Sequence, residues 1–323
     1  MGDKMNKIEE LSVQVKSLSD FISVFENDLR DLYSHNNIRL YFRGEKELYD
    51  EPCTPSLFRK KKTDFKKLSE DEIYYRILRR QSNEFINLTN LDILAKMQHY
   101  GVPTRLLDIT TNPLISLFFA LEKSGTKDGY VYIFTASHEG EKSILSYDSD
   151  RALLISTLPK LSDKQKEYIL DYCKRFPNQK IYPSVLSDND EDKSPIKNEH
   201  KIRRALGKFI YECERERHAF HKNHQVDPQH LLKTYFVKPK FTNERLKAQD
   251  GLFILFGLGS NPYDGKILSI RIPNKFKKFI KAELFFFTGI SNSKVFQGLD
   301  ALASDGKDEL YSELKKKITS IVK

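Results

Sequence analysis

The first 34 residues carry their apolar side chains at spacings of three and four, the period of an amphipathic helix. We therefore predict an N-terminal helical segment over residues 1–34. From residue 38 the period changes to two, because apolar and polar residues alternate. This alternation predicts a strand that ends at Gly44. Its two faces carry Ile38, Leu40 and Phe42 on one side and Arg39, Tyr41 and Arg43 on the other.

The middle of the chain returns to the helical period. Helices are predicted over residues 70–88 and 91–100, and Gly101 ends the second because glycine readily adopts the left-handed conformation that follows a helix. Asn112 is a good cap for a further helix, in which Pro113 is the first residue.

Short apolar runs in the rest of the chain have the composition of strands. The run at residues 129–134 is apolar on both faces, which is typical of a central strand. Residues 273–282 read as a basic helix, and the chain from Leu299 onward reads as helical. The strands predicted beyond residue 44 are 129–134, 234–238, 252–256, 266–272 and 284–287, and residues 106–107 are either a short buried strand or an extended loop.

Residues 141–232 differ from the segments on either side because they are highly charged and helical in pattern. We predict that they form a helical insertion. The flanking residues 35–140 and 233–323 are then the two halves of one domain, and the second half ends in a C-terminal helix.

Composition narrows the class of protein. No stretch approaches the roughly 20 apolar residues that span a bilayer, and the polar residues 1–10 do not resemble a secretory signal. The three widely spaced cysteines, Cys53, Cys173 and Cys213, are typical of free thiols in a reducing compartment. We therefore expect a soluble, cytoplasmic protein with no membrane partner. The net charge of +9 favours solvation and can also attract nucleic acid or an anionic dinucleotide.

The segment Tyr41-Phe42-Arg43-Gly44 is the first candidate for chemistry. An arginine at a strand end can hold a phosphate with its rigid fork of donors, and glycine lets a ligand approach the backbone. The alternative is a structural arginine paired with a carboxylate such as Asp108.

Three later segments carry clustered polar groups. Residues 98–108 surround a turn that either presents side chains such as Gln98 and His99 to a ligand or simply caps a helix. Residues 110–113 read as a turn and a helix cap. Gln249 or Asp250 is placed either at the edge of a cleft or in an ordinary turn before a strand.

Three well-known functional motifs are absent from the sequence. There is no P-loop glycine pattern, nucleophile elbow or HExxH motif. His218, His221 and His224 are spaced by three, which can place imidazoles on one helix face where they could bind zinc. They lie beside a run of Glu and Arg without the paired spacing of a zinc site, so we favour a solvated face and expect no metal.

Taken together, these motifs resemble the FRG-domain family. The resemblance covers roughly residues 35–305, within which residues 140–230 are poorly constrained. It implies that most of this span has the domain of that family. The matching segments are Phe42-Arg43-Gly44, Gln98 through Thr110, Asn112-Pro113, Phe119-Ala120, Arg245 through Phe253, Gly289-Ile290 and Phe296 through Leu302, where the family's Phe-Pro-Asp-Leu-Asp-Gly becomes Phe-Gln-Gly-Leu-Asp-Ala.

A more distant resemblance is to the arginine-type ADP-ribosyltransferases, which use NAD as co-substrate. Arg43-Gly44 is similar to their first element, Asp108 through Thr111 to their second, and Gln249 stands where their late catalytic glutamate stands. The resemblance implies that Arg43 holds the pyrophosphate and that a threonine hydroxyl orients the nicotinamide ribose. It implies catalytic roles for Arg43, Thr110, Thr111 and Gln249, and NAD contacts for Tyr41, Arg43, Gly44, Gln98, His99, Arg105 and Asp108.

The third element departs from that family because the amide of Gln249 carries no charge and cannot act as a general base. We therefore expect an ADP-ribosyltransferase-like domain that binds NAD, with a nucleic acid or a protein as acceptor. A bacterial toxin or phage-defence setting is implied by the resemblance alone. The alternative is a non-catalytic module that binds a nucleotide or nucleic acid. For the fold we expect the α+β class, with a split or strongly bent mixed sheet, flanking helices and the helical insertion.

Overall fold

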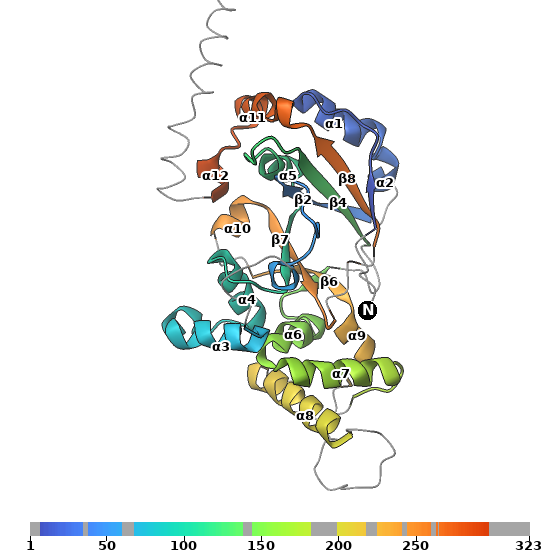
Figure 1. Ribbon diagram of the computed structural model, residues 1–323, viewed down its shortest axis with the longest axis vertical. Helices are drawn as coiled ribbons and strands as arrows, with labels where there is room; N and C mark the ends of the chain where they lie inside the picture. Colours follow the sequence, from blue (N-terminus) through green and yellow to red (C-terminus); the bar gives the residue numbers. More distant parts are fainter. Residues whose placement is uncertain are drawn as a thin grey trace, which may run out of the picture.

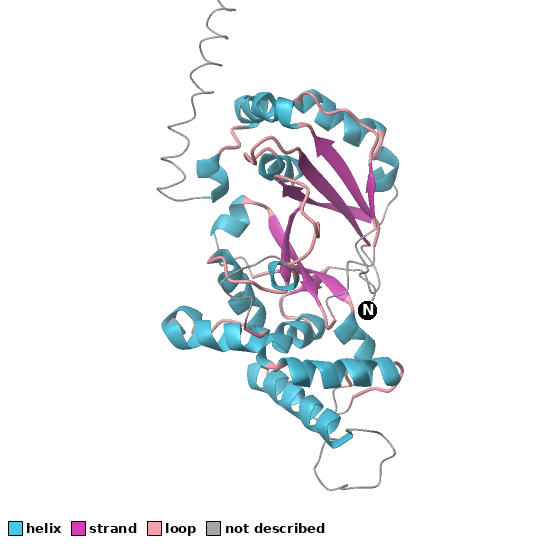
Figure 2. Cartoon of the chain, viewed as in Figure 1, coloured by secondary structure: helices cyan, strands magenta, loops and turns pink. Residues whose placement is uncertain are grey.

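A computed structural model describes residues 7–34, 38–59, 68–137, 144–181, 199–217, 225–240, 244–259, 263 and 265–296. One eight-stranded mixed sheet runs through the molecule in the order β1-β8-β4-β2-β3-β7-β6-β5. Helices cover both ends of the molecule (Figures 1 and 2). The α+β class expected from the sequence is confirmed. The strands are β1 (Ile8–Glu10), β2 (Ile38–Glu45), β3 (Leu106–Thr110), β4 (Gly129–Ser137), β5 (Leu145–Ser146), β6 (Thr234–Lys238), β7 (Gly251–Phe256) and β8 (Ile267–Ile272).

The helices fall into two groups. The group at one end of the sheet comprises α1 (Leu18–Asn27), α2 (Arg30–Ser34), α5 (Pro113–Ala120), α11 (Asn274–Thr288) and α12 (Asn292–Phe296). The group at the other end comprises α3 (Glu70–Arg80), α4 (Asn90–His99), α6 (Asp150–Thr157), α7 (Asp163–Arg175), α8 (Glu199–Glu216) and α9 (Pro228–Leu232). The short helix α10 (Glu244–Ala248) lies between β6 and β7 in the chain.

The sheet is nearly divided between β2 and β3. A single residue pair, Phe42 with Thr110, joins these two strands, whereas β2 pairs with β4 over its whole length. The two halves of the sheet, β1-β8-β4-β2 and β3-β7-β6-β5, are therefore joined by this one residue pair and diverge on leaving it. Aromatic side chains fill the space between them, and the rings of Tyr41 and Phe236 lie 5.1 Å apart.

Alternation along β2 sends its side chains into two separate cores. Leu40 and Phe42 join the cluster under α1, α5 and α11, whereas Tyr41 joins the cluster between the sheet halves. The central position predicted for residues 129–134 is confirmed, because β4 lies between β8 and β2.

Helix α5 packs closely on β2 and β4 because two glycines leave room for it. A Cβ atom at Gly44 would lie 1.8 Å from the carbonyl oxygen of Ser116, and one at Gly129 would lie 2.1 Å from that of Ala120. The helix begins as the sequence predicts: the side chain of Asn112 accepts a hydrogen bond from the amide of Leu114, and Pro113 follows.

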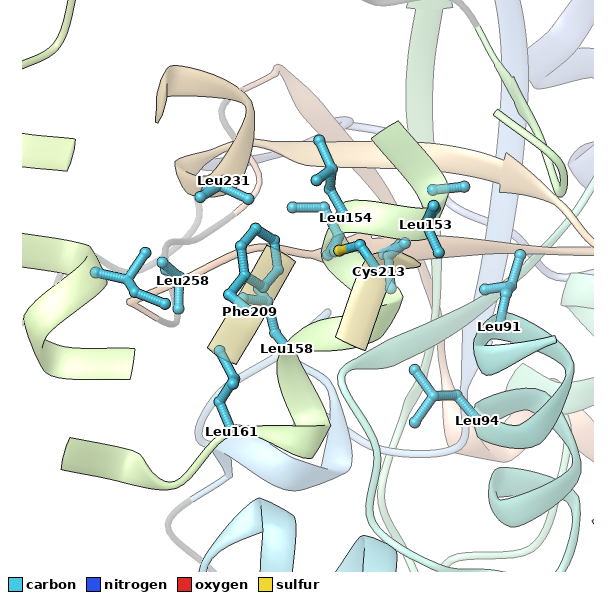
Figure 3. Packing of buried hydrophobic residues seen from close by; sticks show 14 of the residues in the cluster. Leu91, Leu94, Leu153, Leu154, Leu158, Leu161, Phe209, Cys213, Leu231 and Leu258 are labelled. Atoms are coloured by element: carbon cyan, nitrogen blue, oxygen red, sulfur yellow. The ribbon is translucent and has the colours of Figure 1, made fainter. Parts of the chain in front are cut away.

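A third core joins the β3-β7-β6-β5 half of the sheet to helices α3, α4 and α6–α9 (Figure 3). Phe209 and Cys213 of α8 belong to this cluster, as do Leu158 and Leu161. Cys53, Cys173 and Cys213 are all buried and free of disulfides. None of the helices in the described ranges is long and apolar enough to cross a membrane.

Three sequence predictions of secondary structure are wrong, and the helix predicted from Leu299 onward lies outside the described residues. The helix predicted over residues 70–88 ends at Arg80, and a short 3-10 helix, Ser82–Phe85, follows it. Residues 284–287 are not a strand, because α11 continues through Thr288 and ends at Gly289, which has φ 66°. The buried apolar face of this helix is made by Ile280 and Leu284, four residues apart, whereas Phe286 and Phe287 are exposed. Residues 8–10 form a strand, not part of a helix, and pair in parallel with β8.

Candidate functional site

A cavity of about 540 Å³ opens beside the division between β2 and β3. Its walls come from the end of β2, from β3, from the C-terminal end of α4 and from α10 with the residues that follow it. Apolar side chains of α5 close its back. The residues singled out from the sequence that line the cavity are Arg43, Gly44, Gln98, His99, Asp108, Thr110 and Gln249.

Three neighbouring strands bring distant residues together here. Arg43 belongs to β2, Asp108 to β3, and Gln249 directly precedes β7, and these strands are consecutive in the sheet. Asp108 pairs with Phe253 in the β3–β7 register, while Thr111 donates its amide to the carbonyl of Asp250 at 3.1 Å. The sheet order thus explains why segments 200 residues apart in sequence share one cavity.

The guanidinium of Arg43 is mostly buried and has two partners. Its Nε donates to Oε1 of Glu45 at 2.8 Å, and its Nη1 donates to the backbone carbonyl of Asp108 at 2.9 Å. Burial opposes the charge, but the carboxylates of Glu45 and Asp108 outweigh it, and the pKa of Arg43 is raised. Within the described ranges, Nη2 has no hydrogen-bond partner. Arg43 is therefore a structural residue that also faces the cavity.

Glu45 holds the cavity residue Arg43 in place, and the sequence analysis did not identify it. It is buried, and Nη2 of Arg59 lies 3.9 Å from its Oε1. The signal was present in the alternation of β2, since Arg43 and Glu45 are two residues apart and project to the same side of the strand.

Asp108 is an exposed carboxylate of the cavity beside Arg43. Its side chain is 58% exposed, and Oδ2 lies 4.0 Å from Nη1 of Arg43. Gln98 donates through Nε2 to this Oδ2 at 2.6 Å, and Thr104 in turn donates its hydroxyl to Oε1 of Gln98 at 2.6 Å. This chain of hydrogen bonds fixes the carboxylate beside the guanidinium.

The hydroxyl of Thr110 uses its hydrogen bonds to hold neighbouring backbone. It donates to the carbonyl of Gln249 at 2.7 Å and accepts from the amide of Asn112 at 2.9 Å. Thr111 does not line the cavity, and its hydroxyl lies 3.5 Å from the carbonyl of Asp250. The hydroxyl of Thr110 therefore positions Gln249.

The side chain of Gln249 reaches toward α12. Its Nε2 donates to the carbonyl of Val295 at 3.1 Å. On the neighbouring turn of α10, the guanidinium of Arg245 lies over the ring of Phe296, 5.0 Å from its centroid. Phe296 also packs against Phe119, which lines the cavity. Helix α12 thus supports the wall that carries Gln249.

Tyr41 and Arg105 do not line the cavity. Tyr41 is buried between the sheet halves, where burial raises the pKa of its hydroxyl. Arg105 is 2% exposed, and its Nε and Nη2 donate to the two carboxylate oxygens of Glu70. Its Nη1 donates to the carbonyl of Phe256 at 2.7 Å. These partners account for the donors of Arg105 within the core.

Gly44 does line the cavity, but the space that it leaves free is filled by α5, as the 1.8 Å clash of a Cβ with Ser116 indicates. The alternative that residues 98–108 cap a helix also holds for part of that segment. The backbone of Tyr100 ends α4, and Gly101 follows with φ 77°.

Positively charged side chains also line the cavity. Lys96 of α4 and Arg245 of α10 both lie near enough to His99 for their charges to act on its imidazole. Desolvation of the imidazole, together with the charges of Arg245 and Lys96, lowers the pKa of His99 from 6.5.

The three histidines considered as metal ligands, His218, His221 and His224, lie outside the described residues. In the ranges that the structure describes, no group of three His, Cys, Asp or Glu side chains is arranged to hold a metal ion.

Comparison with known proteins identifies one domain. Residues 38–129 match the family model of the FRG domain. This span contains Arg43, Gly44, Gln98, Asp108 and Thr110, so the matched segment supplies most of the cavity residues chosen from the sequence. No curated protein matches the chain. No solved structure matches it either.

Proposed function

We propose that the FRG-domain segment, residues 38–129, and the strand that follows Gln249 together form a binding site for NAD, from which the protein transfers ADP-ribose. The observation that carries this proposal is that Arg43, Asp108 and Gln249 come from three adjacent strands and line one cavity. Its volume of about 540 Å³ lies within the range of roughly 300–1,000 Å³ that is typical of small-molecule sites.

Arg43 is suited to the pyrophosphate. Its Nε and Nη1 are held by Glu45 and by the carbonyl of Asp108, so the guanidinium is fixed before a ligand arrives. A phosphate oxygen would accept from Nη2. A pre-oriented guanidinium loses little conformational entropy when it binds, which favours affinity.

Asp108 supplies the carboxylate that Gln249 lacks. Gln98 holds one oxygen of Asp108, which leaves Oδ1 for a ribose hydroxyl. In this arrangement Thr110 acts indirectly, because its hydroxyl holds the backbone of Gln249. The amide of Gln249 can still accept a hydrogen bond from the sugar through Oε1.

The proposed reaction breaks the bond between C1′ of the ribose and the nicotinamide nitrogen. Nicotinamide leaves as a neutral molecule with the bonding electron pair, and positive charge develops on the sugar. An oxygen or nitrogen of the acceptor forms the new bond to C1′ and releases its proton to Asp108 or to water. The carboxylate of Asp108 would stabilise the developing charge, the kind of effect that gives the largest share of many enzymatic accelerations.

The second candidate function is a non-catalytic nucleotide-binding module. The observation that favours it is that Gln249 carries no charge and donates its amide to Val295. In such a module Arg43 and Asp108 would bind the nucleotide as described, and no bond of the ligand would be cleaved.

The test measures NAD binding by calorimetry and nicotinamide release by chromatography, with the full chain. The informative variant is Asp108→Asn, which keeps the shape of an exposed side chain and removes its charge. Asp163→Asn on α7 is the matched control, because Asp163 is 62% exposed and lies outside the cavity lining.

We expect wild-type protein and the Asp163→Asn control to release nicotinamide, and Asp108→Asn to release it at least tenfold more slowly. Binding of NAD without any release would support the non-catalytic module. Absence of NAD binding in folded wild-type protein would refute an NAD site, with or without catalysis.

A further inference from the structure

Tyr100 is an exposed aromatic residue at the mouth of the cavity. It is 63% exposed although it ends a helix whose preceding residues line the cavity. Its amide donates to the carbonyls of Lys96 at 3.3 Å and Met97 at 3.1 Å, so the ring is carried on a fixed backbone. The exposed ring offers a flat face on which an aromatic ring of a ligand can stack.

Basic residues line the cavity together with this ring. The imidazole of His99 contacts the ring edge to face, with centroids 5.2 Å apart. Lys96 lies one turn earlier on the same helix, and Arg245 lines the cavity from α10, which Figure 1 shows on the same side of the molecule as α4. The charges of Lys96 and Arg245 both act on His99, which confirms that these groups are close to one another.

Asp92, Asp108 and Glu244 are the carboxylates of the cavity lining, and each has a partner within the protein; that of Asp108, which is 58% exposed, is Gln98. Glu244 pairs with Lys247 at 2.8 Å, and Asp92 is buried and accepts a hydrogen bond from the hydroxyl of Thr89 at 2.8 Å. Lys96 pairs with Glu84 at 2.7 Å, an exposed pair that a strong anion can replace because such pairs contribute little to stability.

We propose that this mouth binds single-stranded nucleic acid, with one base stacked on Tyr100 and the adjoining phosphates beside Lys96 and Arg245. The strand would place a nucleotide at the opening of the cavity, where it would act as the acceptor of ADP-ribose. Its role as acceptor rests on the function proposed above, whereas its binding does not.

A nucleic acid fits this surface better than a peptide does. An acidic peptide would use the cations but would leave the flat face of Tyr100 uncovered. A single strand uses both, because every base has a π-face and every nucleotide carries a phosphate. The net charge of +9 adds a general attraction for a polyanion.

The test measures the fluorescence anisotropy of a labelled single-stranded oligonucleotide of twelve thymidines, titrated with the full chain at low salt and without NAD. The variants are Tyr100→Ala and Tyr100→Phe. The matched control is Tyr211→Ala on α8, since Tyr211 is 54% exposed and lies near Lys208 and Arg215, away from the cavity.

We expect Tyr100→Ala to weaken binding by about 5- to 150-fold, the range that loss of one stacked base gives. Tyr100→Phe and Tyr211→Ala should bind like the wild type, and affinity should fall as salt rises. No binding by wild-type protein, equal binding by Tyr100→Ala, or Tyr100-independent binding of a duplex would each overturn the inference.

The two proposals can fail separately. Oligonucleotide binding that depends on Tyr100, without any nicotinamide release, would keep the binding surface and remove its role as acceptor site. Nicotinamide release without oligonucleotide binding would keep the proposed reaction and overturn the inference about its acceptor.

Discussion

Nη1 of Arg43 donates to the backbone carbonyl of Asp108 at 2.9 Å, at the point where β2 and β3 separate. The strands pair at Phe42 and Thr110 only, and continued antiparallel pairing would set Gly44 opposite Asp108. The guanidinium therefore satisfies a carbonyl that the sheet leaves without a backbone partner. The same side chain both closes the division of the sheet and forms the wall of the cavity that this division creates.

This dual role predicts a large loss of stability in Arg43→Ala. The substitution would leave Glu45, 1% exposed, without its nearest cation, and removal of one member of a buried ion pair costs about 3–5 kcal/mol. We expect a decrease of that size in the free energy of unfolding, measured with urea. The double variant Arg43→Ala, Glu45→Gln should recover part of it, because the uncompensated charge is gone.

The control for this experiment is Arg39→Ala, an exposed position on the same strand, which should cost under about 1 kcal/mol. Equal effects at Arg39 and Arg43 would contradict a structural role for the guanidinium.

A second prediction is that the Gly44→Ala variant is less stable than the wild type. In Gly44→Ala the new Cβ would lie 1.8 Å from the carbonyl oxygen of Ser116, and this backbone cannot move without displacing α5 from β2. We expect a loss of about 3 kcal/mol or more, at the upper end of overpacking effects, measured by thermal or urea unfolding.

Gly207→Ala is the matched control, because it lies within α8 and no atom comes within 4 Å of its added Cβ. Alanine there should stabilise the helix by up to about 1 kcal/mol. A Gly44→Ala protein as stable as the wild type would show that α5 can shift away from the strand.

The parts of the fold that follow from local periodicity could be predicted. Alternation identified β2, and the pair Asn112-Pro113 identified the start of α5. The strand β1 could not be found in this way, because its three residues form a strand only by pairing with residues 267–269 at the other end of the chain. The apolar run at 284–287 was misleading, since four consecutive apolar residues fit either a strand or a buried turn of helix.

The site was predictable to a similar extent. The segment from Gln98 to Asp108 reads as one motif in sequence, but Gln98 and Asp108 line the cavity while Arg105 lies in the core. Spacing cannot distinguish these roles, because the partner of Arg105 is Glu70, on a helix 35 residues earlier. Only the three-dimensional packing of α3 shows why that arginine is buried.

The pair of Glu70 and Arg105 predicts a dependence of stability on pH. Burial opposes ionisation of Glu70, but the charges and hydrogen bonds of Arg105 and Lys166 outweigh it and lower its pKa from 4.5. A carboxyl with a lower pKa in the folded state stabilises the fold above its unfolded pKa, and this contribution is lost as pH falls. The free energy of unfolding should therefore decrease below about pH 4.5.

Glu70→Gln tests this assignment. At pH 7 the variant should be less stable by about 3–5 kcal/mol, since Arg105 keeps its buried charge without a carboxylate partner. Its stability should also fall less steeply than that of the wild type between pH 4.5 and 3. Parallel pH profiles for the two proteins would exclude Glu70 as a source of the acid sensitivity.

His99 predicts a pH dependence of ligand binding. In the ligand-free protein desolvation, Arg245 and Lys96 lower its pKa from 6.5, and a bound phosphate at the rim would raise it. A group with a higher pKa in the complex takes up a proton on binding, so affinity is greatest below the free pKa and is lost as pH rises through the bound pKa. NAD affinity, measured by calorimetry from pH 8 to pH 5.5, should rise by up to about tenfold for each pH unit by which binding raises the pKa of His99.

His99→Gln should abolish this rise, and His200→Gln, at an exposed position of α8, should retain it. A wild-type profile that stays flat, or that rises equally in His99→Gln, would show that no phosphate of NAD binds beside His99.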